Sequence, residues 1–190
     1  MSLQSDPNFT LDVGKKAYRW GTGYAWNPVA FVERAKDAGN PDLAREGFWI
    51  LGFDWIRSLD GPLQTVAFTP LLLPNHGELN EDFGEPGYTN FAAKLYLLYR
   101  DIDIDLLILT EGSRSARYAV YFANTFTPNF WLHGECAYIT DVPSRSITPA
   151  CTQGPLQVQD VTSYLLGTRY RNDAYATVVI EYYFNGAGNH

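Results

Sequence analysis

The sequence predicts an all-β fold: an antiparallel up-and-down meander of about nine strands that forms an incomplete part of a transmembrane β-barrel. Three observations support this fold class. Apolar and polar residues alternate with a period of two in most segments. Aromatic residues make up 15% of the 190 residues, and such residues favour strands. The connections between the alternating segments are short and long in turn.

The alternation is clearest in the second half of the chain. Residues 130–139 read FWLHGECAYI, so His133 and Glu135 lie opposite the small and apolar residues. Residues 174–184 read AYATVVIEYYF and alternate in the same way, with Glu181 on the polar face. The same pattern predicts strands at residues 9–20, 46–58, 63–73, 91–100, 104–111, 116–125, 130–140, 162–171 and 174–184.

The predicted connections differ in length between the two ends of the sheet. Residues 59–62, 101–103, 126–129 and 172–173 form short turns, whereas connections at the other end are longer. Outer-membrane barrels have this asymmetry, with short periplasmic turns and long outer loops. We therefore expect a single β-barrel domain over residues 1–190, with a disordered start at 1–8 and long outer loops at 21–45, 74–90 and 141–161.

Alternation alone does not show which face points inward. A soluble β-sandwich or a lipocalin-like barrel has its apolar face inside, whereas a membrane barrel has it outside and encloses a polar interior. Charges of both signs are scattered over the polar face, which suits a water-filled lumen. We predict that eight polar residues face the lumen and influence selectivity: Asp54, Lys94, Asp105, Arg117, His133, Glu135, Arg169 and Glu181.

The first long loop adds further basic residues. Arg34, Lys36 and Arg45 would form a constriction that filters anions if this loop bends into the barrel mouth, and would be surface charges otherwise. Residues 29–39 of the same loop have a helix-like pattern that stops at a glycine.

The sequence predicts no catalytic residues, cofactor or metal. His133 and Glu135 share a strand face, but no third metal ligand accompanies them, so we interpret them as lumen residues. The GTG stretch at residues 21–23 lacks the βαβ context of a phosphate-binding loop and is interpreted as loop glycines. Residues 101–105 lack the Gly and Glu of a calcium loop, and residues 111–115 lack a nucleophile elbow.

The composition restricts the partners and the compartment. The formal net charge of −7 at pH 7 argues against a nucleic-acid partner. No apolar run approaches the roughly 20 residues that a membrane helix needs. The start MSLQSDPNFT has no features of a signal peptide, which fits a cytosolic protein or an exported one whose signal peptide was removed or truncated, and we expect the latter. Cys136 and Cys151 would pair in an oxidising compartment, or Cys136 would be a small buried or lipid-facing residue.

Three stretches resemble a known family. Residues 14–37, GKKAYRWGTGYAWNPVAFVERAKD, and residues 44–56, AREGFWILGFDWI, resemble porin-like outer-membrane β-barrel proteins of Gram-negative bacteria, most specifically in RWGTGYAWNP. The closing VIEYYFNGAG, residues 179–188, resembles a recurring strand of the same barrels. The resemblance extends over nearly the whole chain from Phe9. Because the family is poorly characterised functionally, it implies an architecture and a bacterial outer-membrane location rather than a substrate. Upstream strands and a closing strand of the family are missing, so we expect a fragment.

The expected function is therefore that of a porin-like channel for passive passage of small solutes, without enzymatic activity. Its partners would be the lipid bilayer, the solutes and further copies of the chain in a homo-oligomer. Two alternatives stay open. One is an outer-membrane enzyme, export or assembly component built on the same barrel. The other is a soluble β-sheet module that binds carbohydrate through exposed Trp residues.

Overall fold

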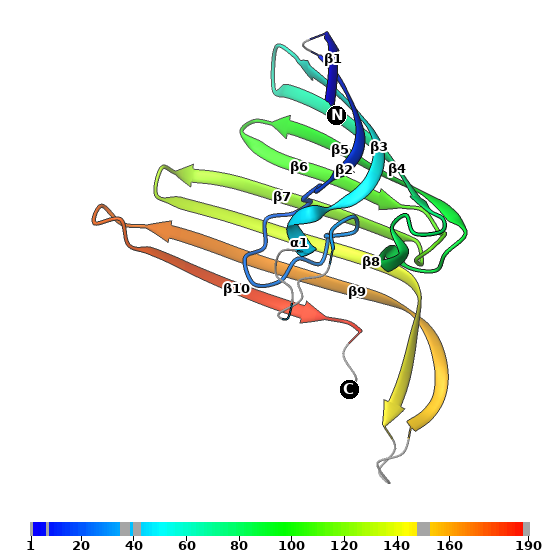
Figure 1. Cartoon of the computed structure of the whole chain (residues 1–190). Helices are drawn as coiled ribbons and strands as arrows, with labels where there is room; N and C mark the ends of the chain where they lie inside the picture. The colour runs from blue at the N-terminus through cyan, green and yellow to red at the C-terminus, as the bar shows by residue number, and fades with distance from the viewer. Residues whose placement is uncertain (1, 7, 35–38, 40–42, 148–152, 188–190) are drawn as a thin grey trace.

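The computed structural model describes residues 2–6, 8–34, 39, 43–147 and 153–187. They form one antiparallel sheet of ten strands that pair in the order of the chain (Figure 1). The strands are β1 (Ser2–Asp6), β2 (Phe9–Lys16), β3 (Phe48–Ser58), β4 (Leu63–Asn75), β5 (Tyr88–Tyr99), β6 (Ile102–Leu109), β7 (Arg117–Thr127), β8 (Phe130–Ile147), β9 (Gln153–Arg171) and β10 (Thr177–Asn185). Two short helices, α1 (Leu43–Glu46) and η1 (Glu81–Phe83), lie in the connections. The predicted all-β meander is confirmed.

Every predicted strand is present, and the N-terminal region adds one more. The expected disordered start at residues 1–8 is wrong for most of its length, because Ser2–Asp6 pairs antiparallel with β2. The helix-like pattern of residues 29–39 is misleading. Residues 29–34 form turns, and residues 35–38 lie outside the described part of the chain. The side chains of Val29, Phe31 and Val32 are buried against the sheet instead, so tertiary packing overrides the local helical pattern.

β8 and β9 extend beyond the rest of the sheet. Residues 141–161, predicted as a long loop, belong largely to these two strands, which pair out to Ile147 and Gln153. The pattern hides this extension because the pairing shifts near Asp141, where φ is 51°, and a bulge of this kind breaks the period of two. In Figure 1 the two strands curve away from the sheet together.

Residues 17–34 fold across the concave face of the curved sheet (Figure 1), and we call them the inner segment. Val29 and Phe31 of this segment are completely buried. The core that they join also contains Trp20, Val32, Phe48, Ile50, Leu71, Leu73, Phe83, Ala92, Leu107, Leu109, Tyr121, Ala123 and Ala137. Most of these residues lie toward the long connections. The half of the interior next to those connections is therefore apolar. The interior is therefore polar mainly in its other half, toward the short turns, and not throughout as we expected.

The convex face carries the large exposed apolar side chains. Trp49, Leu51 and Phe53 of β3 are 46%, 45% and 37% exposed, and their register partners on β2 are exposed as well. The same face includes Leu72, Phe91, Leu106, Tyr118, Val120, Phe122, Tyr164, Leu166, Val178, Ile180 and Tyr182. This arrangement is the reverse of a soluble barrel, in which the apolar positions of each strand point inward.

The sheet is open within the described residues. β1 and β10 are its two edges, and each pairs with a single neighbour. In the part of the chain that the structure describes, no helix has the length and apolar character needed to cross a membrane.

Candidate functional site

The polar half of the concave face is organised in rows that run across the strands. Residues opposite each other in register share a face. One row joins Tyr96, Asp105, Tyr121, Glu135 and Leu165 on β5 to β9. This row places Asp105 and Glu135 on the same concave face, although they are 30 positions apart in the sequence.

A neighbouring row brings His133 and Glu181 together. Both are register partners of Gly167, which lies between them on β9. Because Gly167 has no side chain, the two residues meet above it, with His133 Nε2 3.3 Å from Glu181 Oε1. A Cβ atom at Gly167 would lie 2.3 Å from the His133 ring. The contact between His133 and Glu181 therefore requires glycine at position 167.

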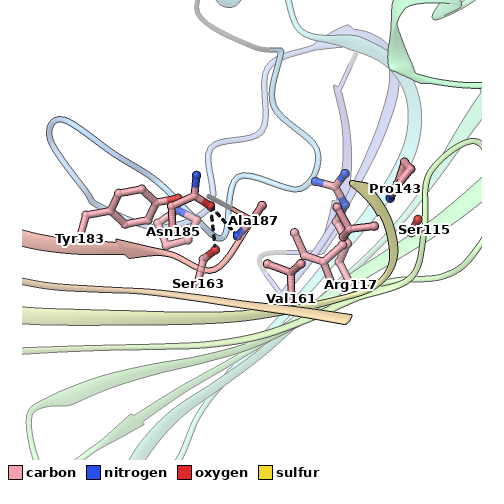
Figure 2. Close-up of a pocket in the computed structure, with 11 residues that line it drawn as sticks. Ser115, Arg117, Pro143, Val161, Ser163, Tyr183, Asn185 and Ala187 are labelled. Carbon is pink, nitrogen blue, oxygen red and sulfur yellow. Dashed lines mark hydrogen bonds between the residues drawn. The ribbon is translucent and has the colours of Figure 1, made fainter. Parts of the chain in front are cut away.

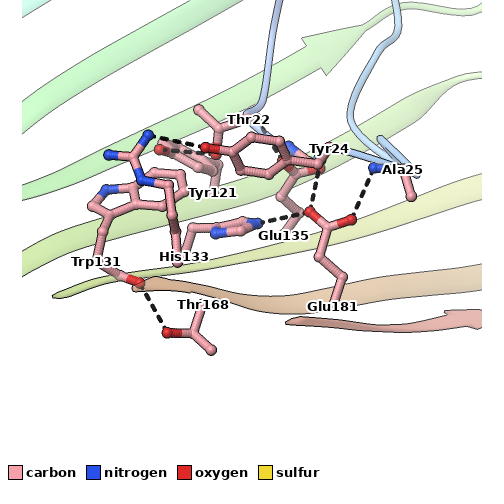
Figure 3. A network of polar contacts seen from close by, with 11 residues as sticks. Thr22, Tyr24, Ala25, Tyr121, Trp131, His133, Glu135, Thr168 and Glu181 are labelled. Carbon is pink, nitrogen blue, oxygen red and sulfur yellow. Dashed lines mark hydrogen bonds and ion pairs between the residues drawn. The ribbon is translucent and has the colours of Figure 1, made fainter. Parts of the chain in front are cut away.

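The carboxylates of Glu135 and Glu181 hold the inner segment by its backbone (Figure 3). The Glu135 Oε1 atom accepts hydrogen bonds from the amides of Thr22 and Gly23, at 2.7 and 2.9 Å. The Glu181 carboxylate accepts from the amides of Tyr24 and Ala25, at 2.6 and 2.9 Å. Four consecutive amides are therefore satisfied by two charged acceptors, the stronger kind of protein hydrogen bond.

The glycines of the GTG stretch make this approach possible. Gly21 has a φ of +80°, which side-chain-bearing residues rarely adopt, and a Cβ there would lie 2.7 Å from Glu135 Oε1. At Gly23 a Cβ would lie 1.8 Å from the carbonyl oxygen of Trp26. The stretch does form a loop, as predicted, and its amides bind a carboxylate that belongs to the protein itself.

Aromatic side chains surround the carboxylate anchors (Figure 3). Trp131 stacks on His133 with 4.4 Å between ring centroids. The Arg169 guanidinium lies 5.1 Å from the Trp131 ring and donates a 3.0 Å hydrogen bond to the Tyr24 hydroxyl. These contacts join β8 and β9 to the inner segment and narrow the polar half of the interior.

The remaining predicted lumen residues also lie on the concave face. Asp54 accepts a 2.5 Å hydrogen bond from Thr69 on the neighbouring strand, and Thr69 is buried. Lys94 is half-buried, two positions before Tyr96 of the first row. All eight predicted residues therefore share one face, but they do not form one site. Glu135, His133, Arg169 and Glu181 gather at one side of the inner segment, Arg117 lies against Phe31 of the same segment, and Asp54, Lys94 and Asp105 lie along the strands.

Arginines form a second group at the other side of the inner segment. A cavity of about 660 Å³ is lined there by Arg19, Arg34, Arg114 and Arg117. Arg34 donates to the carbonyl of Gly47 at 2.9 Å and is held by an ion pair with a carboxylate of η1. Of the residues predicted for the constriction, Arg34 lines this cavity. Lys36 lies outside the described residues, and Arg45 is exposed on α1 away from the described lining of the cavity.

A second cavity of about 230 Å³ adjoins the first at Arg117, which lines both. Figure 2 shows the Arg117 side chain rising from the sheet near Val161, with Ser163 and Asn185 farther along the same cavity. Arg19, Arg114 and Tyr121 belong to the site but were not predicted. Arg114 lies in a connection, where alternation carries no information. Arg19 falls in the predicted strand 9–20, but that strand ends at Lys16 and Arg19 belongs to the inner segment. Tyr121 follows the same period as its predicted neighbours.

Other predicted polar groups do not assemble into a reactive centre. Asp103 accepts from the Tyr96 hydroxyl at 2.5 Å, while Asp101 contacts Gln64 in a turn. No group of three or more metal-ligating side chains of His, Cys, Asp or Glu is found among the residues that the structure describes. Cys136 is a free thiol, and Cys151 lies outside the described ranges.

A buried amide and hydroxyl network fixes the loops beside the arginine cavity. The Asn75 and Asn90 side chains both donate to Ser113 Oγ, at 3.1 and 3.0 Å, and the Ser113 amide donates to Asn90 at 2.8 Å. The EGSRS stretch is therefore a structural turn, as predicted, and it positions Arg114.

Comparisons with known proteins identified no relative: no protein-family model matches the chain, and neither curated proteins nor solved structures gave a significant match.

Proposed function

We propose that the protein is an outer-membrane β-barrel protein that acts as a porin-like channel for passive passage of small solutes. The distribution of side chains over the two faces of the sheet carries this proposal. Large apolar residues cover the convex face, whereas the concave face carries charged residues and buried polar rows beside the apolar core under the inner segment. A membrane barrel needs that distribution because lipid contacts its outside and water fills its interior.

The inner segment would make this channel narrow and selective. Carboxylate anchors hold it across the concave face. Two cavities that meet at Arg117 lie beside it, the larger lined by charged and polar groups and the smaller mainly by apolar ones. A solute crossing the interior would pass these cavities. In this proposal the concave residues tune selectivity and perform no chemistry, so the protein is not an enzyme.

The open edges require partners in a bilayer. Unpaired backbone groups in lipid cost several kcal/mol each, so spanning sheets are closed. We therefore expect β1 and β10 to be paired in the membrane, by further strands or by another copy of the chain in a homo-oligomer.

Planar-bilayer conductance tests the proposal. The protein is expressed with an export signal in a porin-deficient Gram-negative host, extracted in detergent and added to the bilayer. We expect discrete current steps that are absent from extracts of the empty host. A protein that stays monomeric and soluble without detergent would contradict the membrane location and favour the carbohydrate-binding module. A detergent-dependent protein without current steps would favour the export or assembly component.

A further inference from the structure

The charge of the larger cavity points to the chemistry of a ligand. Its described lining contains four arginines, Arg19, Arg34, Arg114 and Arg117, and one carboxylate, Glu33. The volume of about 660 Å³ falls within the usual range of small-molecule sites, roughly 300–1,000 Å³. A sugar-sized solute would fit.

The nearby acids do not balance these arginines. Glu33 accepts a 2.8 Å hydrogen bond from the Trp20 amide, and Asp82 pairs with Arg34 at 2.8 Å. Among the described residues, Glu33, Asp82 and, through its charge interaction with Arg34, Glu46 accompany four guanidinium groups, which leaves an excess of positive charge. Burial, together with the charge of Arg117, lowers the pKa of Arg114 to about 10. Arg114 is therefore still a cation at neutral pH.

The two half-buried arginines, Arg114 and Arg117, differ in what their side chains do. Arg114 donates to the carbonyl oxygens of Phe83 and Phe31, so it fastens the inner segment to the loop of η1. Arg117 lies over the Phe31 ring, 6.0 Å from its centroid, and its buried Nε has no hydrogen-bond partner among the described residues. A buried donor without a partner is costly, and an acceptor in the cavity would satisfy it.

An aromatic side chain completes the lining. Trp26 borders the same cavity and stacks on Tyr183 at 5.5 Å, which holds its ring in place. An indole face fixed in this way would contact the uncharged part of an organic solute.

We infer that this cavity is a binding site for a sugar-sized organic anion that carries a carboxylate or a phosphate. Arg117 and Arg19 would bind the charged group, and Trp26 would contact the remainder. The inference deepens the proposed function by naming its substrate class, and it rests on that function for the passage of the solute through the channel.

Isothermal titration calorimetry in detergent micelles tests the site with probes of matched size. Glucuronate and glucose 6-phosphate carry the charged groups, glucose is the neutral control, and inorganic phosphate lacks the sugar. We expect both charged sugars to bind at least tenfold more tightly than glucose or phosphate. Equal affinity for glucose, or affinity for phosphate equal to that for glucose 6-phosphate, would overturn the inference.

Substitutions locate the site. Arg117→Gln and Arg19→Gln should each weaken binding of the charged sugars by about 10- to 100-fold, the value of one charge-assisted contact. Arg57→Gln, at an exposed position of β3 outside the cavity, should leave the affinity unchanged. Arg19 is exposed, so its variant reports on binding even where Arg117→Gln impairs folding. Unchanged affinity in a folded Arg19→Gln and Arg117→Gln double variant would disprove the site.

Conductance separates this inference from the proposed function. Current steps without anion preference, together with no binding of the charged sugars, would refute the site and leave the channel intact. Binding that Arg19→Gln weakens, in a protein that gives no current, would refute the channel and leave the site intact.

Discussion

At the residue scale, a glycine determines one of the main contacts of the interior. Gly167 separates His133 from Glu181 in register, and only a glycine leaves room for them to meet. Glu181 in turn holds two amides of the inner segment. A methyl group at position 167 would therefore disturb the contact above β9 and, through Glu181, the anchoring of the inner segment.

We predict that Gly167→Ala destabilises the protein by about 1–3 kcal/mol, the usual effect of overpacking. Urea titration in detergent micelles measures this loss as a decrease in the free energy of unfolding. The control Thr162→Ala, at an exposed position of the same strand, should change the free energy of unfolding little. If the new methyl group collides with the His133 ring, Gly167→Ala should destabilise the His133→Ala variant much less than it destabilises the parent protein, because the effects of contacting residues are not additive. Simple additivity would show that the obstacle is elsewhere.

At the element scale, the inner segment is held by acceptors on β8 and β10, two strands that are not neighbours in the sheet. We predict that Glu135→Ala and Glu181→Ala together release it. Amide exchange at residues 22–25 should accelerate by about 10-fold or more, because each charge-assisted bond contributes about 1.5–3 kcal/mol. Hydrogen–deuterium exchange measures this change.

The same double variant should conduct more current, since the released segment no longer narrows the interior. Glu111→Gln, at an exposed loop position, serves as the control for loss of a carboxylate and should behave as the parent protein does. Unaltered exchange at residues 22–25 would show that the apolar core, and not the carboxylates, holds the segment.

The elements also show what the sequence could and could not predict. Alternation located the paired strands and placed His133, Glu135 and Glu181 on one face, because a period of two is a local property. It could not show that residues 22–25 reach these carboxylates, since that contact joins positions more than a hundred residues apart. It also missed the outer part of β8 and β9, where a bulge near Asp141 interrupts the period.

At the scale of the whole molecule, the two faces of the sheet make a directional prediction. Val178 and Ile180 of β10 point to the convex face and are 54% and 64% exposed, whereas Thr177 and Val179 point to the concave face. Val178→Arg or Ile180→Arg should weaken membrane insertion by about 2–4 kcal/mol near the midplane. Thr177→Arg and Val179→Arg should be tolerated because these positions face water.

Folding into lipid vesicles, followed by the change in gel migration on boiling, measures insertion of these variants. The two pairs are matched controls for each other, since they place the same charge on adjacent residues. Equal behaviour of both pairs would mean that the faces are assigned wrongly.

The unpaired edges predict how the isolated chain behaves. Because β1 and β10 each have one free edge, residues 1–190 alone should associate or aggregate and should not run as a heat-modifiable monomer. Light scattering after size-exclusion chromatography in detergent measures the mass. A stable monomer under these conditions would show that the edges are protected by other means.

The anchoring of the inner segment through main-chain amides has a consequence for how the sequence can change. Every residue other than proline offers the same amide, so the carboxylate bonds at positions 22, 24 and 25 do not depend on the side chains there, although the Tyr24 hydroxyl adds a contact with Arg169. Variation at these positions can alter what the interior recognises without dislodging the segment that bears them. The main-chain amides thus hold the segment in place, while the side chains determine what the interior recognises. A randomised library at these positions should yield many folded proteins with different solute preferences.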